Sequence, residues 1–382
     1  MRGRTIIFPV LMFALFAALN SWAADGDVVK IGAIFSVTGP NANLGTPEAR
    51  TLQMLVDRAN ANGGIAGRKV ELFLRDSQGD TEKAISFAKE LIEEQQVLAI
   101  FGPSTSGESM KLKGLCNDDE TILISCAAAE TIVNPVAKWV FKVAPMDSSA
   151  AQMIFRTMKK MGISRIGVLT SNSGFGLGGK EQLEKLSQGS GITVAISEVY
   201  DKDATDLTGV LTKIRGQNVQ AVVNWSTEPA QAIVVKNMKQ LGFEVPLFQS
   251  HGFGNLAYVA AAGKAAEGLI FPAGRVLVAD VLPASNPQKK VLMDYRAAYS
   301  DMFKDEPSTF GGHAFDAFTI LAEAVSKVGT DKYKVRDAIE GIKGLVGITG
   351  VFTFSATDHN GLTMDAFEML TVKNGRFALL AP

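Results

Sequence analysis

The chain has 382 residues, 47% of them hydrophobic, and its 38 basic residues nearly balance its 39 acidic ones, which leaves a formal net charge of −1 at pH 7. This balance argues against a protein that binds nucleic acid or an anionic membrane surface through a basic face. At roughly 150 residues per domain, the length predicts two domains.

The first 23 residues have the features of a secretory signal peptide. Arg2 and Arg4 precede an apolar run over residues 6–19, and Ser21 and Ala23 place small residues where a signal peptidase reads the chain. The run is shorter than the roughly 20 residues of a membrane-spanning helix, so a retained anchor is the weaker interpretation. We expect cleavage after Ala23, with no cysteine at the new amino terminus for lipid attachment, and an exported protein free of the membrane.

The first half of the mature chain alternates strand-like and helix-like segments. Its strand-like runs are too continuously apolar for a half-exposed sheet, which indicates parallel strands covered on both faces by helices. The predicted strands span residues 28–37, 69–74, 97–101 and 121–126, and the predicted helices span residues 46–61, 81–95 and 107–117.

A second α/β cycle begins after the apolar stretch 139–144. Its predicted helices span residues 148–161, 180–188, 207–215 and 230–241, and its strands span residues 166–169, 193–199, 221–225 and 245–249. After about Gly274 come helices at 288–303, 313–328 and 334–342 and then a β-rich tail at 347–380. Helices without a sheet of their own need one to pack on, so we expect the chain to return to the first domain and to cross again near its end. The predicted fold is α/β, with two doubly wound, Rossmann-like lobes, a three-segment hinge and a cleft at the carboxyl ends of the strands.

Two cysteines, Cys116 and Cys126, remain in this exported chain. An even count in an oxidising compartment is compatible with a disulfide, and two buried free thiols are equally compatible with the spacing.

The stretch SNSGFGLGG, residues 171–179, places Gly174, Gly176 and Gly179 on the G-x-G-x-x-G spacing of dinucleotide-binding turns, with Glu198 about 20 residues further on. In a chain with 37 glycines this spacing arises by chance, and an exported protein does not meet dinucleotide pools. We therefore expect no cofactor.

The histidines offer no catalytic pattern. His251, His313 and His359 are far apart in sequence, and no metal-binding, thiol, acyl-transfer or nucleotide-phosphate motif accompanies them. We expect neither an enzyme nor a metal site.

Several motifs, in order along the chain, resemble those of the type I, leucine-binding-protein-like family of periplasmic substrate-binding proteins for branched-chain amino acids. The clearest is Asn60–Arg68, NANGGIAGR, which is similar to the family segment N-A-x-G-G-I-x-G-R/K. The others are Ile31–Ile34 with Thr38–Pro40 and Gly45, Ile100–Pro103 with Ser104–Ser106, Ser125–Ala129, Ala266–Gly268 and Ala314–Ala317.

The resemblance implies two α/β lobes, three chain crossings and a ligand held between the lobes. Lobe 1 would comprise residues 24–146 and 276–364, and lobe 2 residues 147–275 and 365–382. It also implies a periplasmic monomer that delivers a small solute to the permease and ATPase subunits of an ABC transporter. A ligand-binding sensory module that presents its solute to a membrane receptor is the alternative.

The turn at residues 102–106 is rich in glycine and hydroxyl groups and lies between a strand end and a helix start, where free N–H groups hold an anion. The resemblance makes Ser106 a hydrogen-bond donor to a ligand carboxylate, with Thr105 beside it and Ala127 and Ala129 on the facing loop. Ordinary helix capping by the hydroxyls is the alternative.

Elsewhere the site departs from the family pattern. Ala129 supplies no hydroxyl, His251 stands where an acidic residue pairs with the ligand ammonium, Thr227 replaces a tyrosine and Leu44 replaces a loop tryptophan. Phe175 matches an aromatic residue that faces the ligand, with plain packing as its alternative.

Loss of the acidic residue bears on the ligand, because a buried ammonium without a carboxylate partner costs several kcal/mol. Glu228 would substitute if it turned inward, but an acidic residue at a helix start is more often solvated. An aromatic or aliphatic carboxylate or an amide then fits Ser106, Phe175, Trp225 and His251 at least as well as leucine does, unless His251 is simply a core or surface residue.

Overall fold

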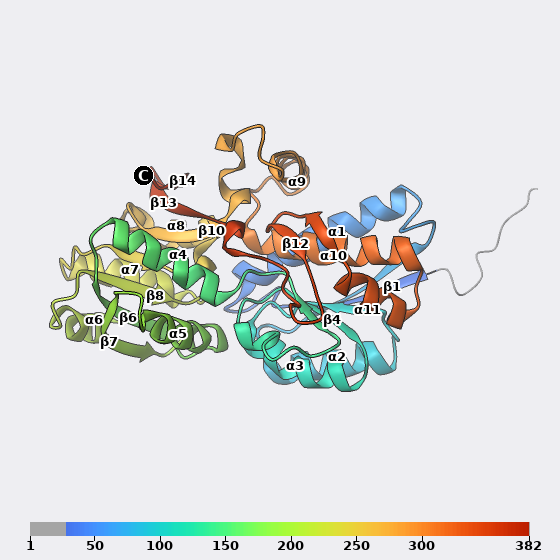
Figure 1. Cartoon of the computed structure of the whole chain (residues 1–382), viewed down its shortest axis with the longest axis horizontal. Coiled ribbons are helices and arrows are strands. Elements are labelled where there is room, and N and C mark those ends of the chain that lie inside the picture. The colour runs from blue at the N-terminus through green and yellow to red at the C-terminus, as the bar shows by residue number, and fades with distance from the viewer. Residues whose placement is uncertain (1–27, 382) are drawn as a thin grey trace, which may run out of the picture.

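The computed structural model describes residues 28–381, so the predicted signal peptide lies outside the described residues. The chain forms two α/β lobes that lie side by side along the long axis of the molecule (Figure 1). Each lobe is built on its own sheet. Within residues 28–381, the remaining two strands, β11 (Lys343–Val346) and β12 (Val351–Thr353), form a separate short hairpin.

The first sheet has five parallel strands in the order β2-β1-β3-β4-β5. Its central strands are buried on both faces, as their continuous apolar sequence predicts. Helices α1 and α10 pack on one face, and α2 and α3 pack on the other. The strands are β1 (Val28–Phe35), β2 (Lys69–Asp76), β3 (Ala99–Phe101), β4 (Ile122–Ser125) and β5 (Val140–Lys142), and the helices are α1 (Ala42–Ala61), α2 (Thr81–Glu93), α3 (Ser106–Asp118), α10 (Thr309–Val328) and α11 (Lys332–Glu340), the last beside α10.

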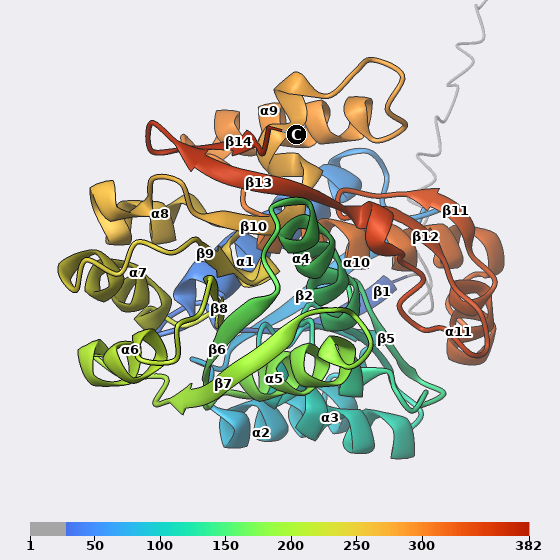
Figure 2. The ribbon, with the colours of Figure 1, turned by 60° about the vertical axis from the view of Figure 1, so that its left-hand side comes forward.

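The second sheet has seven strands in the order β14-β13-β10-β9-β8-β6-β7, of which β13 and β14 run antiparallel to their neighbours. Helices α4 and α5 cover one face, and α6, α7 and α8 cover the other (Figure 2). The strands are β6 (Arg165–Ser171), β7 (Thr193–Tyr200), β8 (Ala221–Trp225), β9 (Leu247–Gln249), β10 (Ile270–Gly274), β13 (Phe367–Lys373) and β14 (Arg376–Leu379). The helices are α4 (Asp147–Lys160), α5 (Gly174–Ser187), α6 (Thr208–Arg215), α7 (Ala230–Gln240) and α8 (Leu256–Ala262).

The chain passes between the two sheets three times. The crossing segments are residues 143–146 between β5 and α4, residues 275–288 between β10 and α9 (Lys289–Phe303), and residues 354–366 between β12 and β13. Helices α10 and α11 thus return to the core of the first sheet. This confirms, for these two of the three late helices, the expectation that they find a sheet in the first half of the chain, whereas α9 packs against Met54 of α1 and the crossing segment at 275–282.

The glycine-rich stretch at 174–179 is helical, so its prediction as a loop before a helix at residue 180 is wrong. Helix α5 begins at Gly174, with the Ser173 hydroxyl accepting a hydrogen bond from the N–H of Gly176. A Cβ on Gly176 would lie 2.1 Å from the carbonyl oxygen of Ser171, and one on Gly179 would lie 2.2 Å from the Trp225 ring. These glycines let the helix pack tightly, which outweighs their low helix propensity.

The two cysteines are free and buried. Cys116 belongs to the core on the α2 and α3 side of the first sheet, and Cys126 belongs to the core on the α1 and α10 side. Burial raises the pKa of the Cys116 thiol to about 12. Of the two arrangements compatible with the sequence, the structure has the free thiols.

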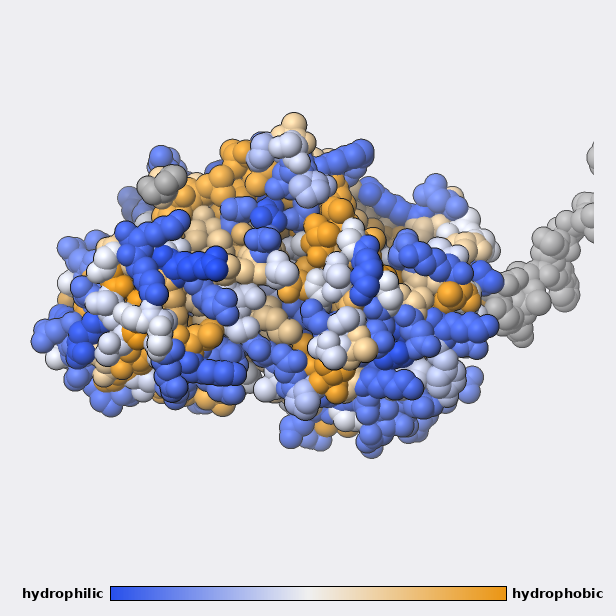
Figure 3. Space-filling view, in the orientation of Figure 1, coloured by the Kyte–Doolittle hydropathy of each residue, from blue (hydrophilic) through white to orange (hydrophobic). Residues whose placement is uncertain are grey.

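Over residues 28–381, no helix combines the length and the apolar character needed to cross a bilayer. The same residues contain no group of three or more His, Cys, Asp or Glu side chains arranged to hold a metal ion. Both lobes present a largely hydrophilic surface in Figure 3, with apolar patches scattered between charged side chains.

Candidate ligand-binding site

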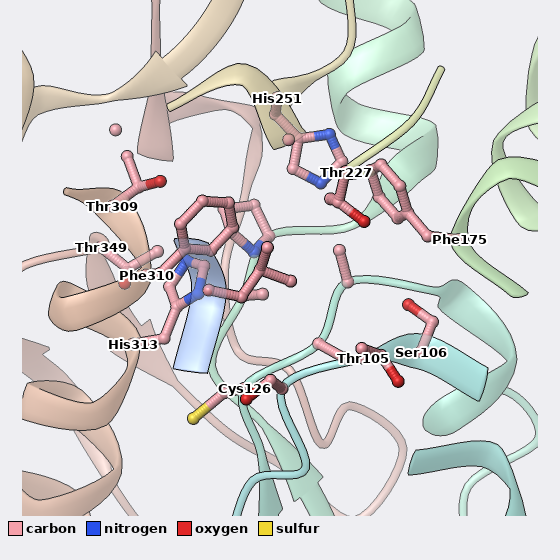
Figure 4. A pocket seen from close by; sticks show the side chains of 18 of the residues that line it. Thr105, Ser106, Cys126, Phe175, Thr227, His251, Thr309, Phe310, His313 and Thr349 are labelled. Atoms are coloured by element: carbon pink, nitrogen blue, oxygen red, sulfur yellow. The ribbon is translucent and has the colours of Figure 1, made fainter. Parts of the chain in front are cut away.

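A cavity lies between the two lobes, at the carboxyl ends of the parallel strands of both sheets. It holds about 600 Å³ of space not filled by protein atoms, including its mouth. Side chains from both lobes point into it (Figure 4), and residues of two crossing segments complete its lining. It is lined by Leu44, Ser104–Ser106, Cys126–Ala128, Ala144, Pro145, Phe175, Thr227, His251, Gly252, Gly274, Val276, Thr309, Phe310, His313, Ile348, Thr349 and Phe367.

On the first lobe, the turn after β3 brings two hydroxyl groups to the start of α3. Thr105 is the N-cap, and its hydroxyl donates to Oε2 of Glu108 at 2.5 Å. The Ser106 Oγ accepts a 3.1 Å hydrogen bond from the backbone N–H of Ala129, and no acceptor within residues 28–381 takes its proton. The Ser106 hydroxyl therefore has a proton to donate toward the cavity.

The facing loop after β4 contributes Cys126, Ala127 and Ala128 to the wall. Ala129 is fully buried and does not line the cavity, in contrast to its predicted position on the ligand-facing loop. Its part is to fix the Ser106 side chain through the backbone N–H.

The second lobe contributes three predicted residues from three strand ends. Phe175 lies in the first turn of α5, Thr227 follows β8, and His251 begins a short 3-10 helix after β9. The His251 ring packs edge-on against Phe175 with 5.3 Å between ring centroids, and against Phe367 at 5.4 Å. Together with Leu44 from α1, these residues line one cavity.

Trp225 does not line the cavity, although the sequence analysis predicted that it contacts the ligand together with Phe175 and His251. It is fully buried behind Phe175 and His251, with ring centroids 5.9 and 5.6 Å away. It supports the two side chains that face the cavity.

The expectation that Glu228 is solvated is also wrong. Its side chain is buried, and its Oε2 accepts hydrogen bonds from the hydroxyls of Ser171 and Ser226 at 2.9 and 2.6 Å. The N–H and hydroxyl of Thr227 lie 3.2 and 3.4 Å from its two oxygens. The carboxylate is thus held within the second lobe and is absent from the cavity wall.

The start of α10 contributes the residues that sequence reasoning missed. Thr309, Phe310 and His313 face the cavity from the first turns of α10, and Ile348 and Thr349 face it from the loop beside this helix. The i, i+3 spacing of Phe310 and His313 was the available signal, since residues three apart share a helix face. Two backbone N–H groups, of Ile348 and Thr349, donate to Asp316 at 2.6 and 2.7 Å, which fixes that loop.

Both imidazoles in the cavity wall are held neutral. Burial, and after it the positive charge of Lys142, lower the pKa of His313 to about 3. The same two causes, in the same order, hold the pKa of His251 well below its usual range. The cavity therefore offers neutral hydrogen-bonding groups and apolar surface, a combination suited to a small organic ligand.

A family model described as "Periplasmic binding protein" matches residues 28–376. The leucine-, isoleucine-, valine-, threonine-, and alanine-binding protein of Pseudomonas aeruginosa is 25% identical over 339 residues, which cover 87% of each chain. Among solved structures, an extracellular ligand-binding receptor from Rhodopseudomonas palustris HaA2 is 28% identical with a TM-score of 0.86, over 92% of this chain and 99% of the other.

A further similar structure is that of the branched-chain amino acid transporter substrate binding protein LivJ from Streptococcus pneumoniae, in complex with isoleucine. It is 25% identical to this chain with a TM-score of 0.80, over 93% of this chain and all of the other.

Proposed function

Because the chain belongs to the periplasmic binding protein family, we propose that it is the solute-binding component of an ABC importer and captures a small carboxylate-bearing solute between its lobes. The observation that carries the proposal is the cavity, whose wall is drawn from the strand ends of both sheets. A ligand that contacts both lobes stabilises their closed arrangement, and such a closure is what a membrane partner can recognise.

The general part of this proposal, that the protein binds a small solute, agrees with the ligands for which its relatives are named. The Pseudomonas protein is named for binding leucine, isoleucine, valine, threonine and alanine, and the Streptococcus structure contains isoleucine. For this chain we propose the wider class of amino acids and related organic acids, because its second-lobe wall differs from the family pattern at His251 and Thr227.

We assign the carboxylate of the solute to the first lobe. The Ser106 hydroxyl has a proton to donate, and the first turn of α3 adds N–H groups that no intrahelical acceptor uses. Thr105 and Ala127 flank this position, while Leu44, Phe175, Thr227 and His251 enclose the rest of the solute.

We base the proposed lobe boundaries, localisation, oligomeric state and partners on membership of the family. Residues 24–146 and 276–364 form lobe 1, and residues 147–275 and 365–382 form lobe 2. The mature protein is a periplasmic monomer, exported by the predicted signal peptide, and its partners are the permease and ATPase subunits of the importer.

Thermal-shift screening tests the proposal first. The mature protein is screened against amino acids, aromatic acids, aliphatic acids and amides, and each hit is titrated by isothermal calorimetry. We expect one small organic acid or amino acid to bind with micromolar or tighter affinity at a stoichiometry of one. Failure of every acid and amino acid to bind would contradict the proposed function.

A further inference from the structure

The cavity wall carries no formal charge. Within residues 28–381, the only titratable side chains that line it are Cys126, His251 and His313. Burial raises the pKa of the Cys126 thiol and lowers the pKa of both imidazoles, so all three are neutral at pH 7. A charged ligand group therefore meets only neutral dipoles at the surface of the cavity.

Several carboxyl groups lie in the layer behind this wall, where they accept hydrogen bonds from the protein itself. The Ser104 hydroxyl donates to Glu48, the Thr105 hydroxyl donates to Glu108, and two backbone N–H groups donate to Asp316. Glu228 accepts hydrogen bonds from three neighbouring residues, as described above.

Asp147 is the remaining carboxyl group close to the wall. It is fully buried and does not line the cavity, and its Oδ1 lies 3.7 Å from Nε2 of His251. Because none of these five carboxyl groups reaches the cavity surface, a ligand ammonium would be desolvated there without an ionic partner.

A buried positive charge also lies directly behind the cavity surface. The Lys142 ammonium is fully buried and donates to the carbonyl oxygens of Ala128, Ala144 and Pro145 at 3.0, 2.6 and 3.2 Å. All three of these residues line the cavity. Three carbonyl acceptors match the three N–H donors of an ammonium group.

The field of Lys142 extends across the cavity. Burial lowers the pKa of the Lys142 ammonium, while the negative charge of Asp147 raises it, and three carbonyl acceptors hold Lys142 in its protonated form. After burial, its charge is the next cause of the lowered pKa of His251, from the second lobe, and of His313, from α10. A potential that opposes protonation of both imidazoles also opposes an ammonium group and favours an anion.

We propose that the ligand is an organic anion with a carboxylate and an apolar body and without an ammonium group, selected by the uncharged cavity wall and by the buried Lys142 ammonium behind it. The apolar body is accommodated by Phe175, Phe310 and Phe367, whose rings enter the cavity from three different elements. The inference rests on the proposed function, since it names the class of solute that the same cavity takes.

Two ligand pairs that differ only in the α-ammonium test the inference on the wild-type protein. The pairs are leucine with 4-methylpentanoate and phenylalanine with 3-phenylpropanoate, each titrated by isothermal calorimetry at pH 7. We expect the ammonium-free member of at least one pair to bind at least about 30-fold more tightly than its amino acid.

An amino acid that binds as tightly as its ammonium-free counterpart, or more tightly, would overturn the inference and leave the proposed function standing. If no acid and no amino acid of the wider screen binds, the proposed function fails, and the inference fails with it. The two failures are therefore distinguishable.

Lys142→Met tests the electrostatic part separately. Wild-type protein should prefer 3-phenylpropanoate over the uncharged 3-phenylpropanamide, and in Lys142→Met this ratio of affinities should fall at least about tenfold. Lys30→Met is the matched control, because Lys30 lies on β1 of the same sheet, bonds one backbone carbonyl at 3.3 Å and does not line the cavity.

An unchanged ratio in folded Lys142→Met protein would contradict the role of Lys142. If Lys142→Met does not fold, the two ligand pairs on wild-type protein decide the inference.

Discussion

The Oγ of Ser106 lies 3.1 Å from the backbone nitrogen of Ala129 and accepts its hydrogen bond. This bond joins the first residue of α3 to the loop after β4, two of the segments on the first-lobe side of the cavity. It orients the hydroxyl before any ligand arrives, so little rotamer entropy is lost on binding.

Ser106→Ala removes this hydroxyl. We expect a ligand carboxylate to bind about 1–3 kcal/mol more weakly, because a charged acceptor loses its donor. Calorimetric titration with the best ligand measures the change. Ser109→Ala, one turn further along α3, removes a hydroxyl that lies 2.7 Å from that of Ser125 and outside the cavity wall, and should affect stability more than affinity. Equal affinities for wild type and Ser106→Ala would refute the assignment.

Gly179→Ala tests the packing of α5 on the second sheet. A Cβ at residue 179 would lie 2.2 Å from the Trp225 ring, so we expect the variant to lose roughly 1–3 kcal/mol of unfolding free energy or more. Gly114→Ala, in the interior of α3 with open space around the new Cβ, should gain up to about 1 kcal/mol. Urea denaturation of both variants makes the comparison, and a stable Gly179→Ala protein would show that α5 shifts freely.

His313 predicts a loss of stability in acid. Its folded pKa of about 3 lies below the unfolded value of about 6.5, so between these values the unfolded chain binds a proton that the folded chain does not. Stability therefore falls as the pH falls through this window, by at most about 1.4 kcal/mol per pH unit from this group. In His313→Gln this contribution is absent.

Urea denaturation of wild type and His313→Gln between pH 7 and pH 4 tests the sign. We expect the stability of wild type relative to the variant to decrease steadily toward low pH. His359→Gln is the control, because His359 is stacked on Phe141 away from the cavity. Parallel curves for wild type and His313→Gln would be the contrary result.

Asp316 predicts a link between stability and ligand binding. Asp316→Ala leaves the N–H groups of Ile348 and Thr349 without their acceptor, and both residues belong to the cavity wall. We expect a loss of roughly 2–4 kcal/mol of unfolding free energy together with weaker ligand binding. Thr319→Val, on the same helix but outside the wall, is the control. Unchanged ligand affinity in a destabilised Asp316→Ala protein would show that this loop does not contribute to ligand binding.

The alternation of apolar strands with amphipathic helices was enough to predict the doubly wound fold, because that pattern has a single packing solution for parallel strands. Helix starts were harder to predict. Helix α1 begins at Ala42 and α10 at Thr309, each four residues before the predicted position. The start of α5 was missed because glycine spacing suggests a turn, whereas close contact with Ser171 and Trp225 decides the local structure.

The site was predicted best where its residues stand at strand ends, as Ser106, Thr227 and His251 do. Residues of the crossing segments, such as Pro145 and Val276, reach the cavity only through the packing of the two lobes, which no local pattern encodes. The direction of the Glu228 side chain depends on hydroxyl partners up to 57 residues away in sequence, for the same reason.

A crystal structure of the protein with the tightest ligand from the screen tests the central claim most directly. We predict one ligand between the lobes, in contact with both, with its carboxylate within hydrogen-bonding distance of the Ser106 hydroxyl. A ligand bound outside this cavity, or held by one lobe alone, would contradict the account.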